Sequence, residues 1–158
     1  MSERKTAVLA QLEKNRAQLF NALSKLDAAA WNKVIYSEET DAQWTTTDIV
    51  RHLLQAESGM TGLMKNIKTK GRGVPEDFDR SRYNRRQVDK LKDKTPRELI
   101  DQMSANRTAL LAFIDTLDDD DWDKNGRHAS LKIMTIEEVC QTIANHEIAH
   151  LNEILDQT

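Results

Sequence analysis

Residues 135–154 read TIEEVCQTIANHEIAHLNEI, which is the pattern of a long helix with one apolar face. Thr135 followed three residues later by Glu138 is a capping box, the arrangement that begins many helices. The apolar residues that follow recur at helical spacing: Ile136, Val139, Cys140, Ile143, Leu151 and Ile154. Such spacing places them along one side of a helix, so this segment is predicted to pack its apolar face against other helices.

Three further segments have the same kind of apolar pattern. They are expected over about residues 3–26, from the threonines at 45–47 to just before Gly71, and from Thr95 to about residue 117. Between the last two lies a long connection, about residues 68–94, in which a short helix is predicted near residues 83–91. Four long amphipathic helices predict an all-α fold: a four-helix bundle with a long crossover between its second and third helices, in a single domain covering residues 1–158.

The composition agrees with a helical domain and excludes several other classes. The 158 residues include two prolines, five glycines and one cysteine, and the net charge is −3. Because β-branched alternation and glycine are scarce, neither an all-β sandwich nor a Gly-rich nucleotide-binding fold is expected. No window approaches 18 consecutive apolar residues, so no membrane span is predicted. The lone Cys140 and the polar first residues favour a cytoplasmic location.

Two segments resemble each other at an offset of 91 residues. Residues 12–32 and 103–123 share six identities in 21 positions, in phase with both apolar patterns. The shared residues are Asn15 and Asn106, Arg16 and Arg107, Leu19 and Leu110, Leu26 and Leu117, Asp27 and Asp118, and Trp31 and Trp122. The repeat predicts two similar helix pairs, each with a tryptophan that packs into the turn after its first helix.

Two histidines of the last predicted helix, His146 and His150, are four residues apart and lie on or next to its apolar face. Neutral imidazoles at this spacing can bind one metal ion, at about 2.0–2.1 Å. His52, on the second long helix, is the expected third ligand, because Ala56 and Gly59 on the same ridge leave space for a pocket. The sequence therefore predicts a three-histidine metal site, with histidines that are merely hydrogen-bonded in the core as the alternative.

The sequence His146-Glu147-Ile148-Ala149-His150 also fits the H-E-x-x-H pattern of zinc peptidases, in which the glutamate is the general base. A peptidase is not expected, because only eight residues follow His150 and the positions of a third ligand hold Glu153 and Asp156. Glu147 is nevertheless a candidate catalytic residue for another reaction. Its alternative role is an exposed ion pair with a nearby Lys or Arg.

Four other residues are compatible either with a functional site or with a structural role. Arg16 and Arg107 lie mid-helix near the apolar faces, where they could line a pocket and bind a carboxylate; the alternative is an ion pair between helices, or a side chain that extends along the core into water. Asn84, in the crossover, is a candidate for positioning a substrate. His128 is expected to be a loop residue rather than a ligand.

The crossover region has an unusual charge. Residues 65–97 contain twelve Lys or Arg and five Asp or Glu, a local excess of +7. A solvated surface explains this excess, and contact with an anionic ligand or nucleic acid is the alternative. Nucleic-acid binding is not expected, because aromatic residues interleaved with the charges are limited to Phe78 and Tyr83.

The order of these features resembles the DinB-like, or YfiT-like, metalloprotein superfamily. The likeness rests on the Trp44-Thr45-Thr46-Thr47 entry to the second helix and the following His-Leu-Leu-Gln-Ala-Glu at 52–57, on the crossover residues 74–78 and 83–84, and on the terminal His-x-x-x-His. The resemblance implies a four-helix bundle that binds a divalent metal ion, often nickel or zinc, through His52, His146 and His150. It also implies frequent homodimers. Members of known activity include thiol S-transferases and a mycothiol-dependent maleylpyruvate isomerase.

Three imidazoles leave coordination positions open, which is typical of a site that performs chemistry rather than a closed structural site. We expect a metal-dependent enzyme that transfers a low-molecular-weight thiol to a small electrophile, with the thiol as co-substrate. One alternative is a non-enzymatic protein that binds a metal or a small molecule under stress. Another is a metal-dependent hydrolase with Glu147 as the base.

Overall fold

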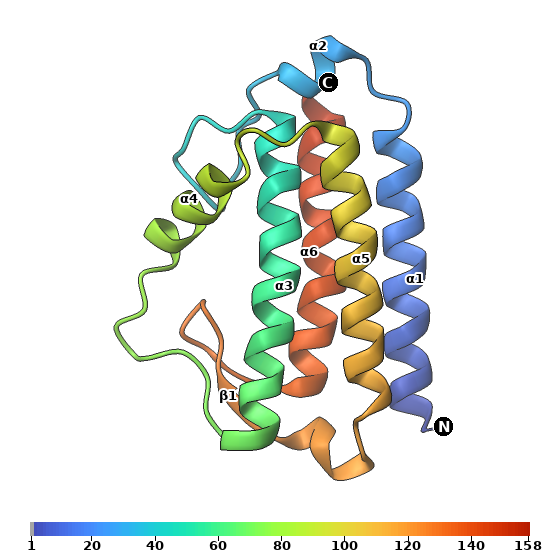
Figure 1. Cartoon of the computed structure of the whole chain (residues 1–158), viewed down its shortest axis with the longest axis vertical. Helices are drawn as coiled ribbons and strands as arrows, with labels where there is room; N and C mark the ends of the chain where they lie inside the picture. Colours follow the sequence, from blue (N-terminus) through green and yellow to red (C-terminus); the bar gives the residue numbers. More distant parts are fainter. Residues whose placement is uncertain (1) are drawn as a thin grey trace.

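The computed structural model describes residues 2–158. In chain order its elements are α1 (Glu3–Leu23), α2 (Ala28–Asn32), α3 (Thr46–Lys70), α4 (Arg80–Lys90), α5 (Pro96–Asp115), the 3₁₀ helix η1 (Asp119–Asp123), β1 (Asn125–Arg127), β2 (Ile133–Thr135) and α6 (Ile136–Gln157). The four long helices α1, α3, α5 and α6 lie side by side and form a bundle (Figure 1). The predicted all-α four-helix bundle is therefore confirmed.

The order of helix directions in the bundle is set by the crossover. In Figure 1, α1 and α6 run in one direction, whereas α3 and α5 run in the other. Since α3 is followed by α5 in the same direction, residues 71–95 must return along the length of the bundle. This segment contains α4, which lies against α3 and begins at Arg80, because the Asp79 side chain caps it by accepting from the Arg82 backbone N–H. The predicted short helix thus exists but starts three residues earlier than expected.

Two capping boxes fix where α3 and α6 begin. Thr45 and Asp48 exchange hydrogen bonds at the start of α3, and Thr135 and Glu138 do so at the start of α6. Each box satisfies backbone N–H groups that a helix end would otherwise leave free. These two helices carry the three histidines singled out above, so the caps help to set the height of each histidine along the bundle.

The ends of α1 and α5 come slightly earlier than the apolar pattern indicates. α1 ends at Leu23 and α5 at Asp115, and short turns then lead into α2 and η1. The repeated tryptophans lie within these two short helices: Trp122 in η1 is fully buried, and Trp31 in α2 is partly buried against the core. Within residues 2–158, no helix combines the length and the apolar character needed to cross a bilayer.

The crossover docks on the short β1–β2 hairpin through close backbone contact. The Val74 N–H donates a 2.9 Å hydrogen bond to the carbonyl oxygen of Arg127. A Cβ atom added at Gly73 would lie only 2.0 Å from that same oxygen, so no larger residue fits without moving the backbone. This contact holds the start of the crossover against the end of the bundle from which β1 emerges.

We predict that Gly73→Ala lowers the free energy of unfolding by about 1–3 kcal/mol, because the methyl group overpacks a backbone contact. Gly62→Ala is the matched control, since a Cβ there meets nothing within 4 Å and the residue lies inside α3. Alanine at that helical position should raise the stability by about 0.5–1 kcal/mol. Urea unfolding of both variants measures the difference, and equal effects would contradict the proposed docking contact.

Candidate metal centre

The structure brings the three predicted histidines together between α3 and α6. The Nε2 atom of His146 lies 3.2 Å from Nε2 of His52 and 3.0 Å from Nε2 of His150. Glu39, from the loop between α2 and α3, lies among them. Its carboxylate oxygens are 3.1 Å from Nε2 of His52, 2.8 Å from that of His146 and 2.5 Å from that of His150. The four side chains offer ligand atoms that all lie within 4.8 Å of one another.

This donor set fits a divalent ion. Four ligands at about 2.0–2.1 Å in a tetrahedron are separated by about 3.3 Å, close to the two nitrogen–nitrogen distances given above. Three imidazoles and one carboxylate are ligands that zinc and other first-row divalent ions accept. The group therefore supports a possible metal site with Glu39 as a fourth ligand.

Neighbouring side chains orient two of the imidazole rings. Nδ1 of His150 lies 2.9 Å from the Glu153 carboxylate, which also accepts a hydrogen bond from the Ser37 hydroxyl. With its Nδ1 proton donated to Glu153, His150 presents the lone pair of Nε2 to the cluster, as metal-binding histidines commonly do. The ring of His52 packs against Trp44, with centroids 5.1 Å apart. The rings are therefore held in place by groups outside the donor set.

The pKa values of the cluster reflect burial together with mutual hydrogen bonding. Burial lowers the pKa of His146, although Glu39 opposes the change. Burial also disfavours protonated His150, but the carboxylates of Glu153 and Glu39 outweigh it and raise its pKa to about 9. Burial opposes ionisation of Glu39, yet hydrogen bonds from the three histidines lower its pKa well below the usual range. The cluster therefore attracts a positive charge, which a proton or a metal ion can supply.

Glu39 is the site residue that the sequence analysis missed. It belongs to residues 33–45, a loop that no helical pattern describes. This loop is fixed by a backbone bridge between Val34 and Thr45 and by hydrogen bonds between Tyr36 and Gln157 at the end of α6. Because these contacts join distant parts of the chain, nothing in the local sequence distinguishes Glu39 from the other acidic residues.

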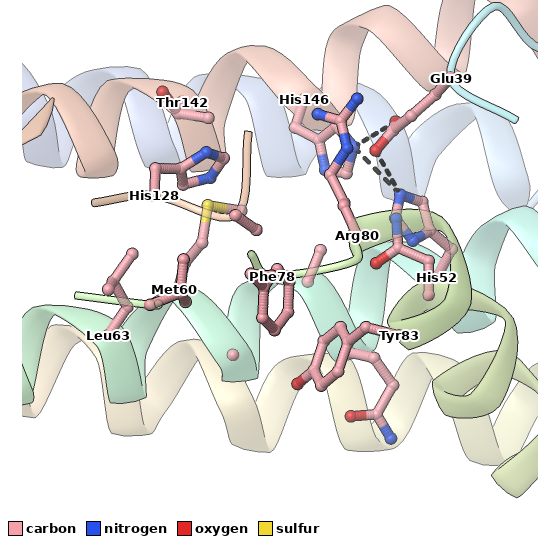
Figure 2. A pocket seen from close by; sticks show the side chains of 16 residues that line it. Glu39, His52, Met60, Leu63, Phe78, Arg80, Tyr83, His128, Thr142 and His146 are labelled. Carbon is pink, nitrogen blue, oxygen red and sulfur yellow. Dashed lines mark hydrogen bonds and ion pairs between the residues drawn. The ribbon is translucent and has the colours of Figure 1, made fainter. Parts of the chain in front are cut away.

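A cavity of about 360 Å³ extends from the cluster along the groove between α3 and α6 (Figure 2). His52, His146 and Glu39 line one part of it, and apolar side chains such as Met60, Leu63 and Phe78 line much of the remainder. Ala56 and Gly59 also line the cavity, as their small size led us to expect. The candidate metal site thus opens onto a largely apolar pocket of the size that small ligands occupy.

Arg16, Arg107 and Glu147 lie in a different place, in the buried centre of the bundle. Glu57 on α3 and Glu147 on α6 are only 2% and 3% exposed. Arg16 Nη2 lies 2.5 Å from Glu57 Oε2 and 2.7 Å from Glu147 Oε1. Arg107 donates from Nε to Glu57 and from Nη2 to Glu147, at 2.6 Å in both cases. The two arginines thus form ion pairs between helices, and Glu147 is paired with them rather than joined to the histidine cluster.

The two remaining candidates, Asn84 and His128, both line the cavity. Asn84 faces it from α4, and Figure 2 shows His128 near Met60 and Thr142. His128 is outside the group of four ligand atoms, in agreement with its assignment to a loop. Its Nδ1 atom accepts a hydrogen bond from the Ser130 backbone N–H at 3.0 Å.

Comparison with a family model gives a match over most of the chain, because residues 11–154 fit the DinB superfamily. The chain belongs to the DinB superfamily. No curated protein matches it at the sequence level. The family match agrees with the resemblance drawn from the tryptophan, histidine and crossover segments.

Solved structures share the fold at low sequence identity. YfiT from Bacillus subtilis, described as a probable metal-dependent hydrolase with an unusual four-helix bundle topology, has a TM-score of 0.74 and 19% identity, with 99% of this chain and 89% of YfiT covered. Structures of a mycothiol-dependent maleylpyruvate isomerase and of a mutant of it have TM-scores of 0.76 and 0.78 and 14% identity. Each covers 98% of this chain, but the chain spans only 63% of the isomerase.

We predict that replacing both His146 and His150 with Ala removes bound divalent metal, measured by elemental analysis after purification and dialysis. His128→Ala is the control and should retain the metal, because His128 lies outside the donor group. Protons compete for the imidazole nitrogens, and the pKa of His150 is raised to about 9, so the affinity for the metal should fall as the pH decreases below about 9. Metal content that is unchanged in the double variant would refute the site.

We predict that Glu147→Gln acts on stability, lowering the free energy of unfolding by about 3–5 kcal/mol, because it leaves the buried arginines without one counter-charge. Glu57→Gln is the matched control, since Glu57 holds the equivalent place in the same ion pairs. Similar losses are expected in chemical unfolding, with metal content retained at low temperature. If folded Glu147→Gln loses far more enzymatic activity than folded Glu57→Gln, Glu147 would instead be a catalytic base.

Proposed function

We propose that this protein is a metal-dependent enzyme that transfers a low-molecular-weight thiol to a small electrophile. The observation that carries the proposal is the opening of the Glu39, His52, His146 and His150 group onto the apolar cavity. In the overall reaction the thiol sulfur forms a bond to an electrophilic carbon, and the group displaced from that carbon leaves together with the thiol proton. The resemblance to DinB-like proteins, whose members of known activity include thiol S-transferases, supports the proposal.

A divalent ion in this site would lower the pKa of a thiol that binds to it, so that the reactive thiolate is present at neutral pH. Glu39 would bind the ion together with the three histidines, and its carboxylate also borders the cavity in which the thiol would bind. The apolar walls of the cavity would bind the apolar part of the electrophile. Asn84, on α4, lines the cavity and would position the polar end of the substrate.

A hydrolase is the second candidate, since YfiT is described in those terms. The version of it that uses Glu147 as general base is disfavoured, because both arginines bind that carboxylate in the centre of the bundle. A protein that only stores metal or a small molecule would also have this donor group. A hydrolase would consume its substrate and water, and a storage protein would consume nothing, whereas thiol transfer consumes a thiol and an electrophile.

We predict thiol-dependent decay of monochlorobimane that depends on the metal and stops when a chelator is added. A thiol with a pKa near 8.5 is only about 3% ionised at pH 7, so full ionisation at the site supplies up to about thirtyfold more thiolate. Fluorescence assays should therefore show rates at least about tenfold above background with one of glutathione, bacillithiol, mycothiol or cysteine. Restoring the metal should restore the rate, and the His146→Ala, His150→Ala double variant should stay at background. Absence of metal-dependent turnover with all four thiols would remove the transferase proposal.

A further inference from the structure

One arginine in the cavity wall has no partner from the protein. Arg80 is half-buried at the start of α4, and its side chain lines the cavity that contains His52 and His146 (Figure 2). Within residues 2–158, its guanidinium makes no hydrogen bond and no ion pair. Arg16 and Arg107, by contrast, are saturated by the two buried glutamates. Arg80 is thus the guanidinium that is available to a ligand in this cavity.

A second donor faces the same space. Because the Ser130 backbone N–H donates to Nδ1 of His128, the neutral ring must hold its proton on Nε2. No acceptor from the described part of the chain pairs with that Nε2–H, although His128 is 92% shielded from solvent. Burial, and then the charge of Arg80, lower the pKa of His128, so the ring stays a neutral donor at pH 7.

The guanidinium of Arg80 and the Nε2–H of His128 donate hydrogen bonds but do not accept them. They would therefore bind a ligand group that only accepts hydrogen bonds. A carboxylate meets this requirement and also neutralises the guanidinium, to which it can bind through two parallel hydrogen bonds. The walls around it, including Met60, Leu63 and Phe78, match an apolar or aromatic ligand body.

We propose that Arg80 and His128 form a carboxylate-binding subsite, which selects small carboxylic acids with an apolar body as the electrophilic substrates of this protein. That these acids are substrates rests on the proposed thiol transfer, whereas binding of an acid at the subsite requires only the cavity. The apolar walls assign the carboxylate to the electrophile, because the common thiol co-substrates have polar bodies. Arg80 and His128 are then specificity-determining residues.

The test compares acids with their neutral amides by isothermal titration calorimetry on the full-length protein, both metal-loaded and metal-free. The pairs are phenylacetate with phenylacetamide and 4-phenylbutyrate with 4-phenylbutanamide, which differ only in the head group. Wild type should bind an acid at least about tenfold more tightly than its amide, because a hydrogen bond to a charged group is stronger than a neutral one. Arg80→Gln should remove most of this preference while changing amide affinity by no more than about twofold.

Arg86→Gln is the matched control, since Arg86 is on the same helix, carries the same charge, is exposed and does not line the cavity. It should retain the preference for the acid. His128→Phe should weaken acid binding while His128→Gln, which keeps a donor, should weaken it less. Thermal unfolding of each variant establishes that it is folded.

Persistence of the Arg80 effect in metal-free protein excludes direct binding of the carboxylate to the metal as its cause. Equal affinity of wild type for acid and amide would overturn the subsite, as would equal losses in Arg80→Gln and Arg86→Gln. Absence of binding by both acids, or Arg80-dependent binding of glutathione alone, would overturn it as well. Because the calorimetric test measures binding, also in metal-free protein, and does not require thiol transfer, failure of the transferase assay and failure of the subsite are separate results.

Discussion

The buried ion pairs at the centre of the bundle constrain the rest of the structure. Arg16, Glu57, Arg107 and Glu147 come one from each of the four long helices, and each guanidinium binds both carboxylates. The four charges sum to zero, but all four side chains are buried. Loss of any one therefore leaves an unpaired buried charge, which lowers the free energy of unfolding by about 3–5 kcal/mol. Sliding or rotating one helix would break at least two of the pairs. The register of all four helices is therefore set at this point.

The ion pairs also sit on an approximate twofold repeat that relates α1 and α3 to α5 and α6. Arg16 donates to the Met103 carbonyl and Arg107 to the Leu12 carbonyl, and these partners are related by the same offset of 91. α3 and α6 correspond at an offset of 90, which pairs Glu57 with Glu147 and the two capping boxes with each other. The histidines break the repeat: the positions equivalent to His52, His146 and His150 are Thr142, Ala56 and Met60. Thr142, Ala56 and Met60 line the cavity. One half of the groove therefore carries the candidate metal ligands, and the other half carries the small and apolar side chains that leave room for the cavity.

The long helices and the histidine site could be predicted from patterns within single helices. The residues whose positions depend on contacts between distant segments could not. The apolar spacing and the caps located the long helices, and the spacing of His146 and His150 with the small residues near His52 indicated a site beside a pocket. Arg16 and Arg107 were ambiguous because a mid-helix arginine is compatible with either a pocket or an ion pair, and only the positions of Glu57 and Glu147 decide. Glu39 could not have been identified, since its place depends on how residues 33–45 dock on the end of α6. Arg80 was hidden for a similar reason: it is one of twelve basic residues in the crossover region, and only the packing of α4 turns it toward the cavity.

The position of Glu147 directly after His146 explains why an H-E-x-x-H sequence here need not act as it does in a peptidase. Successive residues on a helix point about 100° apart, so the face of α6 that presents His146 and His150 to α3 directs Glu147 toward α1 and α5. The glutamate that fixes the rotation of α6 is thus adjacent to one of the candidate ligands. On α3, Glu57 lies five residues from His52 and fixes that helix in the same way. The same ion pairs that set the helix register therefore hold the three imidazoles in position, whereas Glu39, the fourth member of the group, is held by the contacts that its loop makes with Thr45 and Gln157.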